Sequence, residues 1–231
     1  MSDFLRYVLI TRPYEESQDI AQEVAMQGFL PLIAPVLEIV PVPFVLPDDC
    51  QRLVFTSANA VRMAAASLQS RQQMLYCVGS HTAQIARACG WKTIKKAEGN
   101  MAALNRLLAS EKPESGASFV HLSGADIAAP VKIAGKHVRR IVVYKAISSE
   151  KLDEAVWHIL ETGKMYAALF FSSRSAAAFV TLAERRGCTH TVMATKALCL
   201  ADSMVKSISG LPWRSVQVAE TPDRKSLLAL L

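Results

Sequence analysis

The chain repeats its own pattern, and the repeat constrains the fold more than any other feature of the sequence. Residues 53–108 and residues 169–231 each contain a strand, a polar turn and a helix, and then the same three elements again. The stretch LVFTSANA, which begins at Leu53, aligns with LFFSSRSA, which begins at Leu169, 116 residues (169 − 53) further along. A repeat of this length predicts two similar lobes, and two facing α/β lobes favour a ligand in the cleft between them.

Two later pairs of residues extend the repeat. Cys77 corresponds to Cys199 and Trp91 to Trp213, both at an offset of 122 (199 − 77). Because both pairs keep one spacing, the repeat covers most of each half rather than a single motif.

Short apolar runs mark the expected strands. Five lie at the two ends of the chain, at 7–10, 29–36, 168–172, 197–200 and 215–218. The middle supplies five more, at 53–56, 75–78, 92–95, 118–122 and 138–143. The strand-helix-strand stretch at 119–144 is then the counterpart of the one at 7–36. Strands that alternate with helices on short turns predict an α/β fold of two similar doubly wound, mainly parallel five-stranded lobes.

The equal strand counts also predict how the chain is divided. One lobe is discontinuous and consists of residues 1–38 and 148–231, and the second consists of residues 39–147. The chain then crosses between lobes near 37–46 and 144–152, and two adjacent crossings make a hinge. Ligands of doubly wound sheets bind beyond the carboxyl ends of the strands, so the polar turns at those ends are the candidate site.

The charge balance of the chain is moderately basic. Lys and Arg number 26 against 20 Asp and Glu, which gives a formal net charge of +6. Since these cations are spread along the sequence, they serve general solubility, or they make a cleft attractive to a polyanionic small molecule. No segment combines Lys or Arg with stacking aromatic residues, so we expect no nucleic-acid partner.

Two further features bear on the compartment. The apolar stretch from Leu30 to Pro47 holds five of the ten prolines and also Glu38. Proline at that density breaks a helix, so we expect an extended crossing and no membrane partner. The five cysteines are scattered without a metal-type pair, and no signal-peptide pattern precedes them. They indicate buried thiols in a reducing compartment, which predicts a cytoplasmic protein.

Polar turns after the expected strands provide the candidate substrate-binding residues. These are Thr11, Arg12, Ser57, Asn59, Ser80, Thr82, Ser123, Gly124, Ser173 and Ser203. Each turn places hydroxyls or backbone N–H groups at a helix N-terminus, where carboxylates and phosphates bind well. The same residue types cap helices without any ligand, so capping alone stays an alternative for each turn.

Sequence motifs for cofactor or metal chemistry are missing. The chain has no Walker loop, dinucleotide fingerprint, nucleophile elbow or metal-type histidine pair, so we expect no cofactor and no metal. His81 lies on an expected turn and is interpreted as a first-turn residue rather than a catalytic base. Tyr144 ends the apolar run 141–143, where the chain should leave the middle lobe. Its phenol could donate a hydrogen bond or a proton to a leaving group. Alternatively, its ring packs at the hinge and its hydroxyl is exposed to water.

The chain resembles the uroporphyrinogen-III synthase family over nearly its whole length. The resemblance rests on six short stretches taken in order: LITRP at 9–13, PLIAP at 31–35, FTSANAV at 55–61, CVGSHTA at 77–83, VVYK at 142–145 and FFSS at 170–173. It implies two α/β lobes joined by a two-stranded linker, with the linker strands counted in the second lobe and the active site between the lobes.

The resemblance also implies a reaction. The linear tetrapyrrole hydroxymethylbilane loses its terminal hydroxyl, ring D is inverted through a spiro intermediate, and the macrocycle closes to uroporphyrinogen III in haem biosynthesis. This is a lyase reaction that uses no cofactor. Tyr144 matches the family's tyrosine that assists departure of the hydroxyl, and Ser57, Thr82 and Ser173 match cleft positions. We expect a monomer, because the lobes need mobility.

Two turns depart from the family pattern. The turn that starts at Ser123 lacks an arginine that would contact a substrate carboxylate, and Asp202, beside Ser203, brings a negative charge toward an anionic ligand. The alternative is therefore a non-catalytic two-lobe binding module for an anionic metabolite or tetrapyrrole. The same polar turns would serve either protein.

Overall fold

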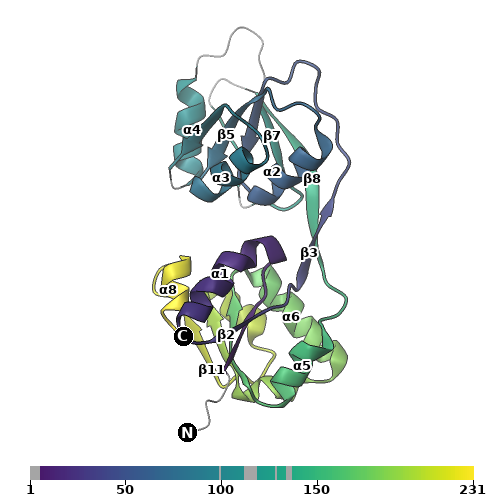
Figure 1. The fold of residues 1–231 in the computed structure, drawn as a ribbon, viewed down its shortest axis with the longest axis vertical. Helices are drawn as coiled ribbons and strands as arrows, with labels where there is room; N and C mark the ends of the chain where they lie inside the picture. The colour runs from purple at the N-terminus through teal and green to yellow at the C-terminus, as the bar shows by residue number, and fades with distance from the viewer. Residues whose placement is uncertain (1–5, 99, 112–118, 128, 134–136) are drawn as a thin grey trace. The chain divides into compact units, whose positions relative to one another are not determined.

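A computed structural model describes residues 6–98, 100–111, 119–127, 129–133 and 137–231. The chain divides into two compact units, shown in Figure 1. Unit 1 is Met1–Glu38 with Ile147–Leu231, and unit 2 is Ile39–Ala146. The sequence analysis placed the second boundary between residues 147 and 148, one residue later.

Unit 1 contains a five-stranded sheet in which neighbouring strands are parallel throughout the described residues. Its order is β11-β10-β9-β1-β2, and the strands are β1 Tyr7–Ile10, β2 Leu30–Ile33, β9 Met165–Phe170, β10 Lys196–Cys199 and β11 Ser215–Val218. The central strands β1 and β9 carry continuous apolar runs, as expected for strands that are covered on both faces.

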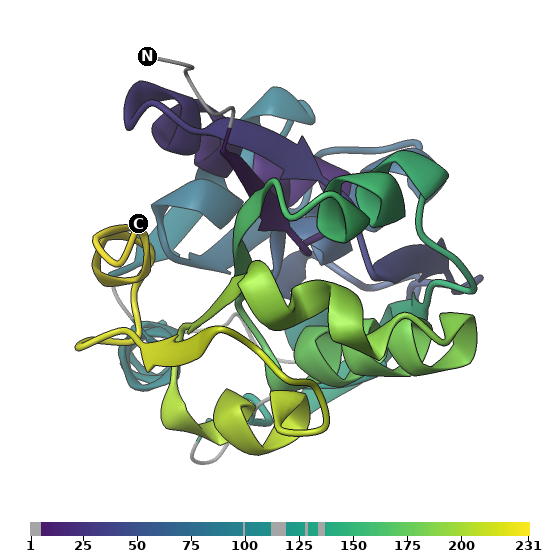
Figure 2. The same ribbon diagram turned by 90° about the horizontal axis from the view of Figure 1, so that it is seen from below.

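Helices cover both faces of this sheet. One face packs on α1 Tyr14–Met26 and α8 Arg224–Leu228. The other packs on α5 Glu154–Glu161, α6 Ser173–Arg186 and α7 Val205–Ile208, with the short 3-10 turns η1 Thr189–Ala194 and η2 Asp202–Met204 beside them. In Figure 2, α5 and α6 are the green helices and α8 is the yellow helix beside the C label. Unit 1 is therefore doubly wound.

Unit 2 contains a six-stranded sheet, so the prediction of five strands is wrong here by one. The order is β3-β8-β7-β4-β5-β6, and the strands are β3 Leu37–Pro41, β4 Arg52–Phe55, β5 Met74–Val78, β6 Ile94–Ala97, β7 Phe119–Gly124 and β8 Val138–Ser148. The additional strand is β3, where the chain passes between the units. Just beyond it Val42 N donates to Val143 O at 3.0 Å, and just before it Val36 O accepts from Ser149 N at 2.9 Å.

Proline explains why β3 was read only as a crossing. Pro41 cannot donate to a ladder, but an edge strand needs a partner on one side only. The pairs 36/149 and 42/143 run in opposite senses, so β3 is antiparallel to β8. The other neighbouring strands of this sheet, in its described residues, are parallel.

The helices of unit 2 lie on the two faces of its sheet. α2 Ala58–Ser67 and α3 Ser80–Ala88 pack on one face, and α4 Met101–Ser110 packs on the other. The expected helix between β7 and β8 does not form in the described residues of that connection. Pro130 lies within it and lacks the N–H that a helix would use.

The internal repeat is present in the topology, but the first alignment is shifted by one residue. Phe55 ends β4, pairs with Cys77 and contacts the Trp91 ring at a centroid distance of 6.0 Å. In unit 1 the same three roles fall to Phe170, Cys199 and Trp213, with the rings 5.6 Å apart. The equivalent of Phe55 is therefore Phe170 rather than residue 171.

Among the described residues, no helix combines the length and apolar character that crossing a bilayer requires.

Candidate functional site

A cavity of about 360 Å³ opens at the carboxyl end of the parallel strands of unit 2. Strands β4, β5 and β7 contribute residues at or just after their ends, β8 contributes Tyr144 opposite the end of β7, and the start of α4 forms part of the wall. The lining residues are Thr56, Ser57, Val78, Asn100, Met101, Gly124, Asp126, Ile127, Ala129 and Tyr144. Because ligands of doubly wound sheets bind at this end of the strands, the cavity is the candidate site.

Tyr144 and Ser57 meet in the wall of this cavity. Ser57 is the N-cap of α2, and its Oγ accepts a hydrogen bond from Asn59 N at 3.2 Å. The same Oγ lies 3.1 Å from Tyr144 Oη. The sequence analysis selected both residues separately, and the fold joins them although they are 87 positions apart.

A β-bulge aims Tyr144 at the cavity. Along β7 and β8, Ser123 pairs with Val142, but the next residue, Gly124, pairs with Tyr144. Val143 is therefore the extra residue of a bulge, and both Val143 and Tyr144 pack against the core beneath α2 and α3. Regular alternation would place these two neighbours on opposite faces, so the bulge turns the tyrosine toward Ser57.

Gly124 makes room for the tyrosine ring. A Cβ atom built on Gly124 would lie 2.6 Å from Tyr144 Cζ and 2.9 Å from Tyr144 Oη. Real Cβ atoms do not approach other heavy atoms so closely, so any larger residue here would displace the phenol. Gly124 was a candidate because of its backbone N–H. Its lack of a side chain also leaves space for the tyrosine ring.

Thr56 connects the cavity to a buried histidine. Thr56 Oγ1 lies 3.1 Å from His121 Nε2, and His121 is only 1% exposed. Burial, with a smaller contribution from the charge of Arg140, lowers the pKa of His121 to about 4. The imidazole is therefore neutral at pH 7, and it holds Thr56 in place without bringing a charge to the site.

Three other selected residues of unit 2 are buried. Asn59 and Thr82 are each 7% exposed, and Ser123 is 1% exposed. The Asn59 Oδ1 atom accepts from Arg62 Nη1 at 3.2 Å, and Ser123 Oγ donates to Gly124 O at 3.0 Å. The side chains of Asn59 and Ser123 are therefore bonded within the protein, and a substrate contact of these three residues stays a prediction.

Ser80 differs from these residues because it is exposed. It begins α3, and its Oγ accepts a hydrogen bond from Lys96 Nζ at 3.1 Å. Lys96 also pairs with Glu98, with the two charged atoms 2.5 Å apart. Ser80 therefore lies beside a cation at a helix N-terminus, although it does not line the cavity of Tyr144.

In unit 1, Thr11 and Arg12 are engaged by the fold. Thr11 is fully buried, and its Oγ1 donates to Leu169 O at 2.9 Å, so it offers a ligand no surface. Arg12 Nε donates to Glu16 Oε2 at 2.8 Å, and its guanidinium lies over the Phe171 ring at 5.1 Å. The hydroxyl of Thr11 is thus engaged by the fold, and Arg12 already has a carboxylate partner.

The remaining two selected residues of unit 1 contact each other. Ser173 Oγ donates to the backbone carbonyl of Ser203 at 3.1 Å. Ser173 begins α6, and Ser203 lies in the turn after β10, so both lie at the carboxyl end of their sheet. Ser203 is exposed and Ser173 is half-buried.

Several residues of the cavity were not expected from the sequence. Asn100 is the N-cap of α4, where its side chain accepts from Ala103 N at 3.1 Å. An asparagine before an apolar helix is a capping signal that could have identified it. Met101 and Ile127 carry no such signal, because an apolar residue near a turn is read as packing.

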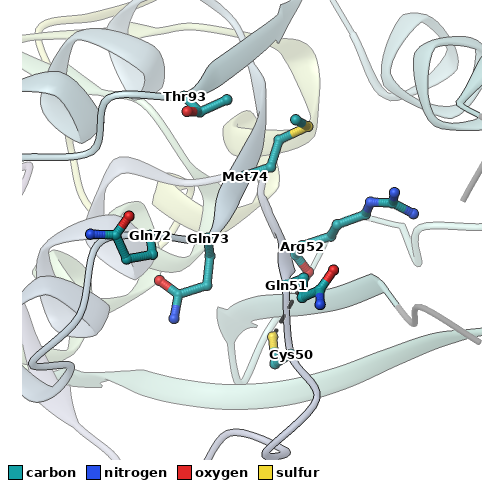
Figure 3. A pocket seen from close by; sticks show the side chains of 7 residues that line it. All are labelled: Cys50, Gln51, Arg52, Gln72, Gln73, Met74 and Thr93. Carbon is teal, nitrogen blue, oxygen red and sulfur yellow. Dashed lines mark hydrogen bonds between the residues drawn. The ribbon is translucent and has the colours of Figure 1, made fainter. Parts of the chain in front are cut away.

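A second cavity of similar volume lies at the opposite, amino end of β4 and β5. Figure 3 shows its lining, which consists of Cys50, Gln51, Arg52, Gln72, Gln73, Met74 and Thr93. The side chains of Arg52 and Gln73 extend in different directions there. Burial raises the pKa of the Cys50 thiol to about 11, so it is protonated at neutral pH. These features do not converge on a ligand.

Within the described parts of the chain, no three His, Cys, Asp or Glu side chains cluster as metal ligands would. Burial also raises the pKa of Cys77 to about 12 and that of Cys199 to about 11. A thiol must lose its proton to act as a nucleophile or a metal ligand. These two cysteines therefore serve as apolar core residues.

Fold and site together define a class: a two-unit, mainly parallel α/β protein with a cavity at the carboxyl ends of its strands. The family model described as uroporphyrinogen-III synthase HemD matches residues 18–229. The chain therefore belongs to the uroporphyrinogen-III synthase family.

The solved structure of a similar protein supports this fold. The uroporphyrinogen-III synthetase of Helicobacter pylori 26695 is 18% identical to this chain. The match covers 98% of each of the two chains, and the TM-score is 0.63. The wild-type uroporphyrinogen III synthase of Thermus thermophilus is 20% identical, covering 97% of this chain and 95% of that one, with a TM-score of 0.39. A comparison with curated protein sequences gave no match.

Proposed function

We propose that this chain is a uroporphyrinogen-III synthase, a lyase that cyclises hydroxymethylbilane with inversion of ring D. The observation that carries the proposal is the Tyr144–Ser57 pair, 3.1 Å apart in the wall of the cavity at the strand ends, within a chain of this family. A phenol beside a cavity can supply a proton or a hydrogen bond where a hydroxyl departs.

The Ser57–Tyr144 bond allows either hydroxyl to be the donor. When Ser57 donates to Tyr144 Oη, the phenol keeps its own hydrogen for the substrate. Tyr144 then acts as the donor toward the hydroxyl that leaves the substrate as water. The remaining π system becomes a cationic azafulvene, so the step needs a donor near the leaving oxygen and no nucleophile.

Positioning is the larger part of the proposed catalysis. Unaided, hydroxymethylbilane closes without inversion to the type I isomer, so the protein must hold ring D in the geometry of the spiro intermediate. Within unit 2, the N-termini of α2 and α3 offer backbone N–H groups for carboxylates of the substrate, with Ser80 at the start of α3. The net charge of +6 favours the same polyanion.

A coupled assay tests the proposal. Hydroxymethylbilane is generated in situ with the purified protein present, and the oxidised products are separated into type I and type III isomers. We expect mostly type III, and only type I in the control without protein. Type I alone in both reactions would refute the synthase and leave a binding module.

We further infer a monomeric protein of the cytoplasm. All five cysteines are free, which suits a reducing compartment. Light scattering coupled to gel filtration checks the first inference, and a mass of twice 25.2 kDa would contradict it.

A further inference from the structure

One arginine outside the cavity fastens the turn on which the tyrosine ring rests. Arg140 Nε donates to Ser123 Oγ at 2.9 Å, and its Nη2 donates to Gly124 O at 2.7 Å and to Ala125 O at 2.6 Å. A single guanidinium thus contacts three successive residues at the end of β7. The planar group of arginine suits such a contact, because its donors are fixed relative to one another.

The same turn is also bonded to the backbone of the tyrosine. Ala125 N donates to Tyr144 O at 2.8 Å, and Gly124 pairs with Tyr144 across the bulge. The close approach of Gly124 to the phenol leaves no free space between them. A displacement of this turn would therefore be transmitted to the ring.

Arg140 itself lies on the other face of the sheet. Its register partner is His121, whereas Ile141 and Val143 point to the face of α2 and α3, with Tyr144 beside them. The arginine therefore acts on the phenol only through the turn. Nothing in the sequence indicates this role, because its effect depends on the reach of the side chain around the end of β7.

We propose that Arg140 is a positioning residue that fixes the 123–125 turn and, through it, the phenol of Tyr144. The consequence for rate rests on the proposed function, since it presumes that the phenol assists the reaction. The consequence for the position of the ring does not, so the two can fail separately.

Kinetic measurements test the coupling to rate. Arg140→Gln should lower kcat about tenfold with KM changed less than about twofold, and in a Tyr144→Phe background it should change kcat less than about twofold. Arg140→Lys keeps the positive charge but loses the planar set of guanidinium N–H donors, so its kinetics should resemble those of Arg140→Gln. Arg139→Gln, at the exposed neighbour on β8, is the matched control and should leave kcat unchanged.

Other kinetic outcomes would overturn the proposal. A higher KM with unchanged kcat would make Arg140 a direct contact of the substrate carboxylates. Full activity of Arg140→Lys would mean that charge alone matters. An equal loss in the Tyr144→Phe background would show that the arginine acts elsewhere.

A spectroscopic measurement reports the position of the Tyr144 ring without an activity assay. With Cζ-labelled tyrosine the five tyrosines give five carbon resonances, and Tyr144→Phe identifies one of them. Arg140→Gln and Arg140→Lys should both shift that resonance, and Arg139→Gln should not. If the Tyr144 resonance stays in place in Arg140 variants that unfold at the wild-type temperature, the proposal is refuted. If the resonance shifts in these variants but the wild-type protein makes no type III product, only the proposed function is refuted.

Discussion

Ser57 and Ser172 cap equivalent helices in the two units, but their hydroxyls have different partners. In unit 2, Ser57 Oγ accepts from the helix and contacts Tyr144 Oη at 3.1 Å. In unit 1, Ser172 Oγ accepts from Ser175 N and contacts Ser175 Oγ at 2.8 Å. One cap is bonded within its own helix, and the other reaches a residue of a distant strand.

A second pair of positions differs in the same way. His121 lies opposite Val54 in unit 2, and its counterpart in unit 1 is Ile10, which lies opposite Leu169. Both residues are buried, but one is an apolar packing residue and the other bonds to Thr56. The repeated positions therefore share the backbone and the core, while the polar chemistry of each unit is its own.

The largest expected effect concerns what the two units share. Phe55→Ala and Phe170→Ala each remove a fully buried ring that contacts a tryptophan, so each should lower the free energy of unfolding of its own unit by about 3–5 kcal/mol. Hydrogen exchange resolved by peptide reports each unit separately. Val45→Ala, at a side chain that is 84% exposed, is the control and should change less than about 0.5 kcal/mol. A large effect at only one phenylalanine would break the equivalence.

The next effect is a loss of stability on acidification that we expect in unit 2 and not in unit 1. The pKa of His121 is about 4 in the folded protein, below its ordinary 6.5, so the unfolded chain takes up the proton first as the pH falls. The stabilisation is complete above about pH 6.5 and is lost toward pH 4, by about 3 kcal/mol in all. We expect this loss in unit 2, measured by hydrogen exchange at pH 7 and pH 4.5.

His121→Ile gives unit 2 the residue type of the equivalent position in unit 1. The difference in acid sensitivity between this variant and the wild type isolates the histidine from the carboxylates that titrate in the same range. If the variant loses as much stability on acidification as the wild type, His121 is not the cause.

A smaller effect concerns the phenol alone. Tyr144→Phe removes one hydroxyl from the cavity wall and should lower turnover in the isomer assay about ten- to hundredfold, which is about 1.4–2.7 kcal/mol of activation free energy. Tyr7→Phe, at the amino end of β1, is the control. Unchanged turnover would remove Tyr144 from the mechanism.

The smallest effect compares the two caps directly. Ser57→Ala and Ser172→Ala should each lower the free energy of unfolding by about 1 kcal/mol, because each helix loses an N-cap. Only Ser57→Ala should also lower turnover, since only that hydroxyl contacts the phenol. Equal turnover losses would mean that the caps do not differ in function.

Much of the fold could be predicted because it follows from periodicity. Every expected strand range overlaps an observed strand, since apolar runs between polar turns determine them. The one-residue error in the repeat arose from two adjacent phenylalanines that match Phe55 equally well. Burial decides between them, because Phe170 is fully buried and Phe171 is not.

The candidate site was harder to predict because it depends on side-chain direction. Ser57, Gly124 and Tyr144 were selected and do share one cavity. Thr11 was selected for the same reason as Ser57, but its hydroxyl turns to a backbone carbonyl of β9. A threonine after a strand gives the same signal in either orientation, so sequence cannot separate the two.

The bulge at Val143 has a consequence for how this chain is aligned with others. The direction of Tyr144 depends on the number of residues that precede it in β8 as much as on its identity. A sequence alignment that forbids a gap inside a strand would place Tyr144 in the wrong column. Deletion of one residue from β8 would leave the tyrosine in the sequence but remove it from the cavity. For this chain, the number of residues in β8 before the tyrosine therefore decides whether the phenol faces the cavity.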